Sequence, residues 1–173
     1  MENTKKKQTK VFVMCGPAGS GKSTWLIKQM KPKTDVCISR DNIRFGLLKE
    51  GEDYFAHEND VKEIFYDSIA DNTSASYWEN IYIDATHLNP RARKDTMWNI
   101  SEHCFVIAVS FEVPAEVAIE RNKKRSGLAR VPDNVIWNMK SRYKIPTLSE
   151  GFDEIWHIDA EGNITWKECR YYE

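Results

Sequence analysis

Long apolar runs and excess charge of one sign are both missing from this sequence, and each absence narrows the class of protein. No stretch approaches the ~20 consecutive apolar residues of a membrane-spanning helix. The net charge is only −1, whereas a protein that grips a long nucleic-acid duplex non-specifically is usually strongly basic. Any contact with nucleic acid is therefore expected to be local, at an end or over a few nucleotides.

Cysteine is also scarce. Cys15, Cys37, Cys104 and Cys169 lie far apart and form no C-x-x-C pair. This spacing fits neither a zinc site nor a disulfide framework, and it predicts free thiols in a reducing cytoplasm. The start of the chain, MENTKKKQTK, is basic but lacks the apolar segment of a secretory signal. We interpret residues 1–10 as a flexible basic tail.

The rest of the sequence alternates short apolar, β-rich runs with helical patterns. At 173 residues it is long enough for one domain with a real core, and we expect residues 11–173 to form it. The expected strands are residues 11–14, 36–39, 81–83, 105–111, 154–158 and 164–167. The expected helices are residues 24–30, 58–79, 90–103, 114–124 and 132–144. This alternation predicts an α/β fold with a mostly parallel central sheet and helices on both faces.

Residues 16–24 read GPAGSGKST and fit the phosphate-binding loop pattern G-x-x-x-x-G-K-[ST]. Backbone N–H groups of such a loop surround the phosphates of a nucleoside triphosphate, and Gly16, Gly19 and Gly21 permit the close approach. Lys22 is expected to reach the β- and γ-phosphates, and the Ser23 hydroxyl to bind Mg²⁺. The neighbouring positions that complete the expected nucleotide contacts are Ser20 and Thr24.

The context of the loop favours this interpretation. A short apolar run at 11–14 precedes it and a helix from residue 24 follows it, which is the strand–loop–helix order that the motif requires. The alternative is a Gly/Ser turn that happens to end in Lys-Ser. We expect a P-loop kinase fold, in which ligands bind at the carboxyl ends of the parallel strands.

An acid–arginine pair follows the second expected strand. Asp41 comes directly after this strand and can accept the proton of an acceptor hydroxyl. Arg44 lies three residues further on, so on a short helix the two side chains would share a face. The alternative is a helix N-cap at Asp41 with a surface ion pair, and the spacing alone does not decide between them.

The third expected strand ends at Asp84, which resembles the second acid that holds Mg²⁺ in phosphate-loop proteins. Thr86 and Asn89 could simply cap the next helix, and for Asn89 we favour that interpretation. His87 is weak evidence for catalysis. The simpler prediction is a surface histidine whose ring nitrogens already have hydrogen-bond partners. A solvated helix face would account for Arg91, Arg93 and Lys94.

Five cations lie within residues 121–130, followed by Val131 and Pro132. Such a run is usually a solvated surface. Its position after the fourth strand favours a mobile helical lid that closes over the nucleotide. An arginine that arrives on closure can neutralise charge on the transferring phosphoryl group, and Arg121 and Arg125 are the candidates for nucleotide contact.

Together these segments resemble the polynucleotide 5′-hydroxyl kinase family, especially the kinase domain of the bacteriophage enzymes. The resemblance spans roughly residues 11–143 and rests on GPAGSGKSTW, SRDNIR, DATHLNPRAR and VAIERNKKRSGLARVP, in family order and at similar spacing. It implies transfer of the ATP γ-phosphate to the 5′-hydroxyl of DNA or RNA, with ATP and Mg²⁺ as cofactors.

The resemblance also assigns roles to individual residues. It implies that Asp41 is the general base, that Arg44 binds the 3′-phosphate of the acceptor nucleotide, and that Arg125 bridges the donor phosphates. Thr86 would lie near the acceptor. The residues that match the apolar wall of the acceptor pocket are Val131 and Val135.

Family members often carry a phosphatase or ligase domain, but this sequence has no D-x-D-x-[TV] signature, so we expect a kinase alone. Two other functions stay open. One is a kinase for a small metabolite or an antibiotic, which would share the loop and lid and differ in the acceptor pocket. The other is a non-catalytic ATP-binding module that controls a partner. A homo-oligomer is also possible, and the sequence does not define one.

Overall fold

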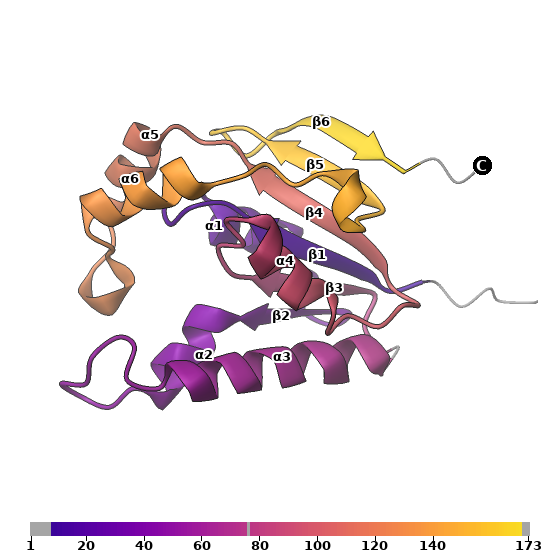
Figure 1. The fold of residues 1–173 in the computed structure, drawn as a ribbon, viewed down its shortest axis with the longest axis horizontal. Helices are drawn as coiled ribbons and strands as arrows, with labels where there is room; N and C mark the ends of the chain where they lie inside the picture. Colours follow the sequence, from indigo (N-terminus) through magenta and orange to yellow (C-terminus); the bar gives the residue numbers. More distant parts are fainter. Residues whose placement is uncertain (1–7, 76, 171–173) are drawn as a thin grey trace, which may run out of the picture.

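The computed structural model describes residues 8–75 and 77–170, which form one six-stranded sheet with helices on both faces (Figure 1). The strands are β1 Lys10–Cys15, β2 Asp35–Ser39, β3 Asn80–Asp84, β4 Phe105–Phe111, β5 Glu154–Ile158 and β6 Ile164–Cys169. The helices are α1 Lys22–Gln29, α2 Arg40–Leu47, α3 Glu58–Ser74, α4 Pro90–Met97, α5 Ala115–Lys123 and α6 Asp133–Arg142. Short 3-10 helices are η1 Gly127–Ala129 and η2 Leu148–Glu150.

The strand order is β2-β3-β1-β4-β5-β6, and only the last pair, β5 and β6, is antiparallel. The expected α/β class with a mostly parallel sheet is confirmed. Because β1 lies between β3 and β4, its carboxyl end is flanked by the ends of two parallel neighbours. The loops that follow β1, β2, β3 and β4 therefore leave the sheet at one edge, where ligands bind in folds of this type.

Two expected helices are shorter than their patterns indicated. The buried positions of α3 recur at Val61, Phe65, Ile69 and Thr73, and the helix ends at Ser74. The α4 helix begins as expected at Pro90, with Asn89 accepting a hydrogen bond from the N–H of residue 92, and it ends at Met97.

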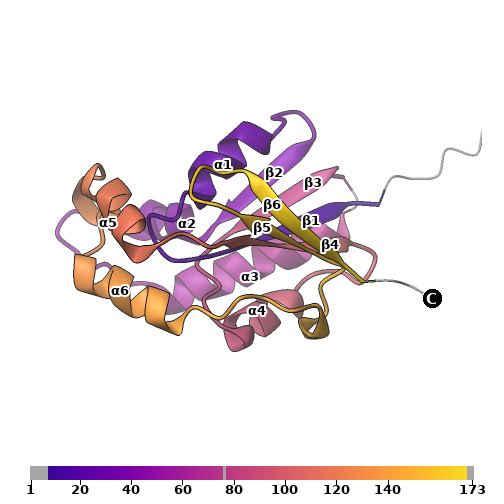
Figure 2. The same ribbon diagram turned by 90° about the horizontal axis from the view of Figure 1, so that it is seen from above.

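The core has a layer on each face of the sheet (Figure 2). Alternate β1 residues point to opposite faces, as the two-residue period of a strand requires. Val11 and Val13 pack on the side of α3 with Phe65 and Ile69. Phe12 packs on the other side in the cluster that contains Trp25 of α1. Both faces of the sheet are thus covered, which holds the carboxyl edge in a fixed position.

Two residues that the sequence placed on the surface are buried. Arg93 has no exposed area and its guanidinium forms a paired hydrogen bond with Glu150, at 2.7 Å from Nε and 2.8 Å from Nη2. Its Nη1 donates to the carbonyls of His87 and Lys144 at 3.0 and 2.8 Å. The solvated-face prediction was therefore wrong for Arg93, because helical spacing cannot reveal a carboxylate supplied from a distant segment.

His87 is likewise buried rather than on the surface, with 4% of its area exposed. Its ring nitrogens lie 2.7 Å from the Met14 carbonyl and 3.0 Å from the Thr96 hydroxyl. Burial lowers the pKa of His87 to about 4, so the ring is neutral at physiological pH. Both ring nitrogens of His87 have hydrogen-bond partners, as expected. These hydrogen bonds join the end of β1 to α4.

A third polar cluster joins the antiparallel end of the sheet to β4. His157 of β5 lies between two carboxylates, with Nε2 at 2.8 Å from Glu168 on β6 and Nδ1 hydrogen-bonded to Glu112 after β4. Burial of the ring lowers the pKa of His157, but the two carboxylates outweigh it and hold that pKa above its ordinary value. The protonated ring is therefore favoured in the folded state.

This cluster predicts a pH-dependent contribution to stability. Since the pKa of His157 is raised on folding, the stabilisation is complete below the unfolded value of about 6.5 and is lost as the pH rises through the folded value. We expect His157→Gln to lower the melting temperature by about 2 °C at pH 5.5 and by less at pH 9. Thermal melts of both proteins across this range measure it, and an equal loss at both pH values would contradict it.

The remaining expectations concern chain ends, membranes and thiols. Residues 1–7 of the expected tail lie outside the described residues, and β1 begins at Lys10, just inside the tail's expected limit. No helix within residues 8–75 and 77–170 has both the length and the apolar character to cross a membrane. The four cysteines are free thiols, as predicted.

Candidate functional site

The loop between β1 and α1 has the backbone of a phosphate-binding loop. Gly19 and Gly21 have φ angles of +78° and +98°, which side chains rarely adopt. A Cβ on Gly19 would also lie 2.2 Å from the Ala118 carbonyl oxygen. The N–H of Gly16 donates to the Thr86 carbonyl at 2.8 Å. The loop is thereby tied to the segment after β3, and Thr86 itself is half-buried beside it.

Lys22 and Ser23 stand at the start of α1 and face the loop and β3. The Lys22 ammonium is buried and donates to the carbonyls of Gly16 and Pro17 at 2.9 and 2.8 Å. Burial lowers the pKa of Lys22, and Asp84 opposes that shift. The Ser23 hydroxyl donates to Asp84 Oδ2 at 3.1 Å. Ser23 and Asp84, which were both expected to bind Mg²⁺, are therefore in contact, and their role as metal ligands remains a prediction.

Asp84 and Ser23 offer oxygen atoms of the kind that Mg²⁺ prefers. Burial raises the pKa of Asp84, while Lys22 and the hydrogen bond from Ser23 lower it. Among the described residues, no group of three or more His, Cys, Asp or Glu side chains could hold a metal by itself. A cation here would therefore need phosphate oxygens to complete its ligands, as Mg²⁺ sites often do. The buried Ser20 hydroxyl also lacks a hydrogen-bond partner in the described chain.

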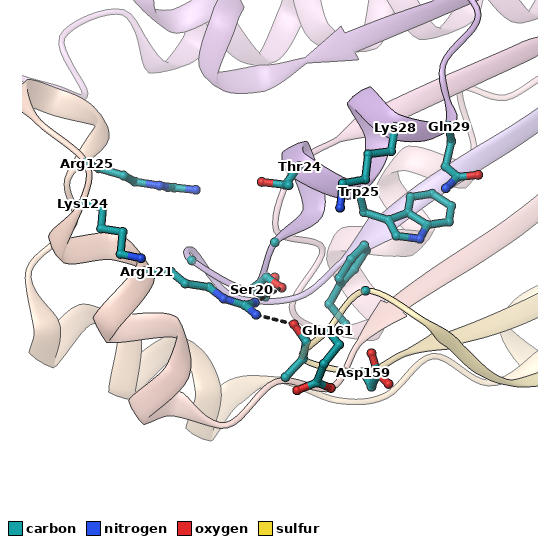
Figure 3. Close-up of a pocket in the computed structure, with 15 residues that line it drawn as sticks. Ser20, Thr24, Trp25, Lys28, Gln29, Arg121, Lys124, Arg125, Asp159 and Glu161 are labelled. Atoms are coloured by element: carbon teal, nitrogen blue, oxygen red, sulfur yellow. Dashed lines mark hydrogen bonds between the residues drawn. The ribbon is translucent and has the colours of Figure 1, made fainter.

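A cavity of about 370 Å³ opens beside the loop (Figure 3). Its walls are residues 19–21 of the loop, the side of α1 that includes Thr24, cations after α5, and the turn at 159–162. The side chains of Lys124 and Arg125 extend into it from the segment after α5. The cavity therefore pairs backbone N–H groups with cations, which suits the phosphates of a nucleotide.

Arg121 links two walls of this cavity. Its guanidinium donates to the Ser20 carbonyl at 3.3 Å and to the Ala160 carbonyl in the β5–β6 turn (Figure 3). Arg121 lines the cavity, and its expected contact with the nucleotide remains a prediction. Residues 159–162 lie between the expected strands 154–158 and 164–167, and the sequence patterns did not assign them to the site. The rule that ligands sit at the carboxyl ends of strands, applied to β5 as well, would have placed them in the site.

The cationic segment from Lys124 to Pro132, which we call the lid, projects from the sheet between α5 and α6 (Figure 1). Its two ends are joined by Asn122, a buried side chain that donates to the Val131 carbonyl at 2.6 Å and accepts from the Val131 N–H at 3.0 Å. Val131 packs against a small apolar cluster at the base of the lid, and Val135 is half-buried on α6. Their place in an acceptor pocket remains a prediction.

Asp41 lies in the first turn of α2, directly after β2. Ser39 pairs in register with Asp84 on β3, so the start of α2 is next to the Ser23–Asp84 pair. Burial lowers the pKa of Lys22 and raises that of Asp84, and the negative charge of Asp41 adds a smaller upward contribution to both pKa values. Asp41 is therefore electrostatically coupled to the phosphate-binding loop. Its side chain is 62% exposed, which leaves it open to an incoming molecule.

The alternative for Asp41 was a helix N-cap with a surface ion pair; the cap was wrong, but the ion pair with Arg44 is present. Ser39 is the cap of α2, and its hydroxyl accepts a hydrogen bond from the N–H of Asn42 at 3.3 Å. The Asp41 Oδ1 atom instead accepts from Arg44 Nη1 and from the Tyr54 hydroxyl, each at 2.9 Å. Oδ2 accepts none of the hydrogen bonds found within the described residues. One oxygen of the carboxylate is therefore fixed and the other is available.

Arg44 shares a face of α2 with Asp41, as the three-residue spacing predicted, but its guanidinium is buried with 5% of its area exposed. It donates to Glu58 at 2.6 Å, to the Tyr54 hydroxyl at 3.0 Å and to Asp41. Its Nε has no hydrogen-bond partner within the described residues but is buried, so a contact between Arg44 and an acceptor phosphate would require the surrounding side chains to move. Tyr54 and Glu58 were missed because the loop between α2 and α3 brings them in, and no spacing pattern reveals it.

The fold and the site together define a P-loop protein with the architecture of small kinases. A family model described as an AAA domain matches residues 11–146, which is most of the chain, so the chain belongs to this family. The expected P-loop kinase fold is thereby confirmed. No curated protein matches the chain.

Solved structures share the fold at low sequence identity. A chain of the Pnkp1/Rnl/Hen1 RNA repair complex is similar over 82% of this chain, with 22% identity and a TM-score of 0.66. This chain spans less than half of that one, 46%. A protein of the PezAT toxin–antitoxin system of Streptococcus pneumoniae has 18% identity and a TM-score of 0.66, covering 93% of this chain and 72% of its own.

A deoxyadenosine kinase from M. mycoides is also similar, with 16% identity, a TM-score of 0.51, and coverage of 88% of this chain and 92% of its own. These proteins differ in what they act on or assemble with, so the shared fold does not identify an acceptor. The acceptor has to be inferred from the residues around Asp41.

Proposed function

We propose that the chain is an ATP-dependent kinase that transfers the γ-phosphate of ATP to the 5′-hydroxyl end of DNA or RNA. The observation that carries this proposal is the position of Asp41, an exposed carboxylate with one free oxygen at the sheet edge that also holds Lys22 and Asp84. A protein that only binds nucleotides has no use for such a base. The acid–arginine pair and the order of motifs support a 5′-hydroxyl acceptor.

The residues present fit ATP and Mg²⁺. The N–H groups of the loop and the Lys22 ammonium would hold the β- and γ-phosphates, and Ser23 and Asp84 would hold the metal. Bound there, Mg²⁺ would neutralise charge on the phosphates. Arg121 and Arg125 line the nucleotide cavity and would contact the donor.

The chemistry at the acceptor side involves one bond exchange. Asp41 Oδ2 accepts the proton of the 5′-hydroxyl as the oxygen forms a bond to the γ-phosphorus. The bond from that phosphorus to the β–γ bridging oxygen breaks, and ADP leaves with the electron pair. Lys22 and the lid residue Arg125 stabilise the negative charge spread over the transferring group.

The acceptor contacts complete the proposal. Thr86 lies beside the loop, and Val131 and Val135 would form the apolar wall against the acceptor nucleotide. Arg44 would donate to the acceptor's 3′-phosphate through its Nε, which has no other hydrogen-bond partner within the described residues. Four free thiols fit a cytoplasmic location.

The test is transfer of label from γ-³²P-ATP to a short oligonucleotide with a 5′-hydroxyl, in a DNA and an RNA series. We expect label at the 5′ end, and none when the same oligonucleotide already carries a 5′-phosphate. Label on a small hydroxyl compound alone would favour the metabolite kinase. Tight ATP binding with no transfer to any hydroxyl would favour the regulatory module.

A further inference from the structure

An exposed row of aromatic rings lies beside Asp41. We call Phe45, Tyr54 and Phe55 the aromatic row. Tyr54 is in the centre, with edge-to-face ring contacts of 6.3 Å to Phe45 and 4.9 Å to Phe55. Phe55 is 63% exposed and Phe45 is 38% exposed. Neither phenylalanine belongs to a core cluster formed by the described residues, so packing in the core does not explain them.

The row is fixed to the proposed catalytic machinery. The Tyr54 hydroxyl donates to Asp41 at 2.9 Å, and the Arg44 guanidinium lies 4.4 Å from the centre of the Tyr54 ring. Burial raises the pKa of Tyr54 to about 12, so this hydroxyl remains a donor at physiological pH. One tyrosine side chain therefore separates Phe55 from Asp41. A molecule that reacts at Asp41 and extends by one more planar group would reach Phe55.

The segment opposite the row is cationic. The lid lies at the same end of the molecule as the loop between α2 and α3, which Figures 1 and 2 show from two directions. Lys124, Arg125 and Arg130 of the lid are exposed. Aromatic rings on one side and cations on the other match a single nucleic-acid strand, whose bases stack and whose phosphates are anionic. A sugar or another small acceptor offers no second base.

We propose that Phe55, supported by Tyr54, stacks on the base of the nucleotide that follows the phosphorylated one. The occupant is a single-stranded 5′ end of DNA or RNA that is at least two nucleotides long. This inference rests on the proposed function, because it takes Asp41 to be the residue that faces the reacting hydroxyl. It adds a subsite that favours acceptors with a second nucleotide, whatever the identity of its base, since every base has a face that can stack.

The first test is binding of a 5′-hydroxyl tetranucleotide that carries 2-aminopurine at its second position. Stacking on Phe55 quenches the fluorescence of this base, so we expect quenching on binding to the wild-type protein. Phe55→Ala should weaken binding by roughly tenfold and abolish the quenching. Phe55→Tyr keeps a ring and should retain both. Trp98→Ala removes an aromatic side chain that is 75% exposed directly after α4, and it should change neither.

The second test compares two acceptors in steady-state kinetics. Phe55→Ala should raise KM about tenfold for a 5′-hydroxyl dinucleotide and leave KM unchanged for a nucleoside 3′-phosphate, which has no second base. Equal effects on both acceptors, or no effect on either, would overturn the subsite while the proposed kinase activity stands. Quenching that depends on Phe55 without any phosphate transfer would uphold the subsite and reject the activity. No binding of the tetranucleotide by the wild-type protein would reject the subsite as well.

Discussion

Replacing Asp41 with asparagine is expected to lower kcat for phosphate transfer by about 10³-fold. The amide keeps the size of the carboxylate and an oxygen that can accept from Tyr54 and Arg44, but it cannot take the proton of the acceptor hydroxyl. Loss of a positioned general base typically costs 10²- to 10⁴-fold. The affinity for ATP should change little, because the donor contacts come from the phosphate-binding loop and the lid.

The measurement is initial-rate transfer from γ-³²P-ATP to a 5′-hydroxyl oligonucleotide, with ATP affinity determined separately by calorimetry. Asn42→Ala is the matched control, since this neighbour on α2 is exposed and only its backbone N–H, which the substitution keeps, donates to the cap residue Ser39. It should transfer phosphate within about threefold of the wild-type rate. If Asp41→Asn also transfers within tenfold of wild type, Asp41 is not the base.

The second large effect is on stability and comes from Arg93. Its fully buried guanidinium binds the Glu150 carboxylate through two hydrogen bonds and satisfies two backbone carbonyls from other segments. Arg93→Ala leaves a carboxylate that is only 15% exposed without its partner. Breaking a buried ion pair in this way costs roughly 3–5 kcal/mol, which corresponds to a loss of about 10 °C in melting temperature for a chain of this length.

Arg91→Ala is the control for this experiment, because Arg91 lies on the same helix and is exposed. It should change the melting temperature by no more than about 2 °C. The double variant Arg93→Met with Glu150→Leu should recover part of the loss, since it removes both buried charges and keeps apolar volume. A loss below 3 °C for Arg93→Ala would show that the pair contributes little to the fold.

The contrast between Arg93 and Lys22 shows which parts of the site could be predicted from the sequence. Lys22 was assigned because a loop motif of nine residues determines its surroundings almost entirely. Arg93 was misplaced because its partner lies 57 residues away, and local spacing contains no information on that contact. The strands and the Asn89 cap of α4 were predicted for the same reason as Lys22, since they depend on neighbours in sequence.

On the acceptor side of the site, too, local spacing did not reveal the contacts that come from other segments. The pairing of Asp41 with Arg44 follows from helical spacing. Tyr54 and Glu58 complete that network, but they reach it through a loop and the first turn of α3. The orientation of the Asp41 carboxylate is therefore a tertiary property. The sequence indicated which acid to examine, and the structure was needed to show which of its two oxygens is free.

The buried Asn122 closes the ends of the lid into a ring through its two hydrogen bonds with Val131. Because the ends are already held together, extra residues at the tip would add only the entropy of a longer loop, about 0.6 kcal/mol for each doubling of its length. The tip can therefore diverge in length and charge between related proteins while the base stays constant. Acceptor range could evolve there by insertion, without repacking the domain beneath.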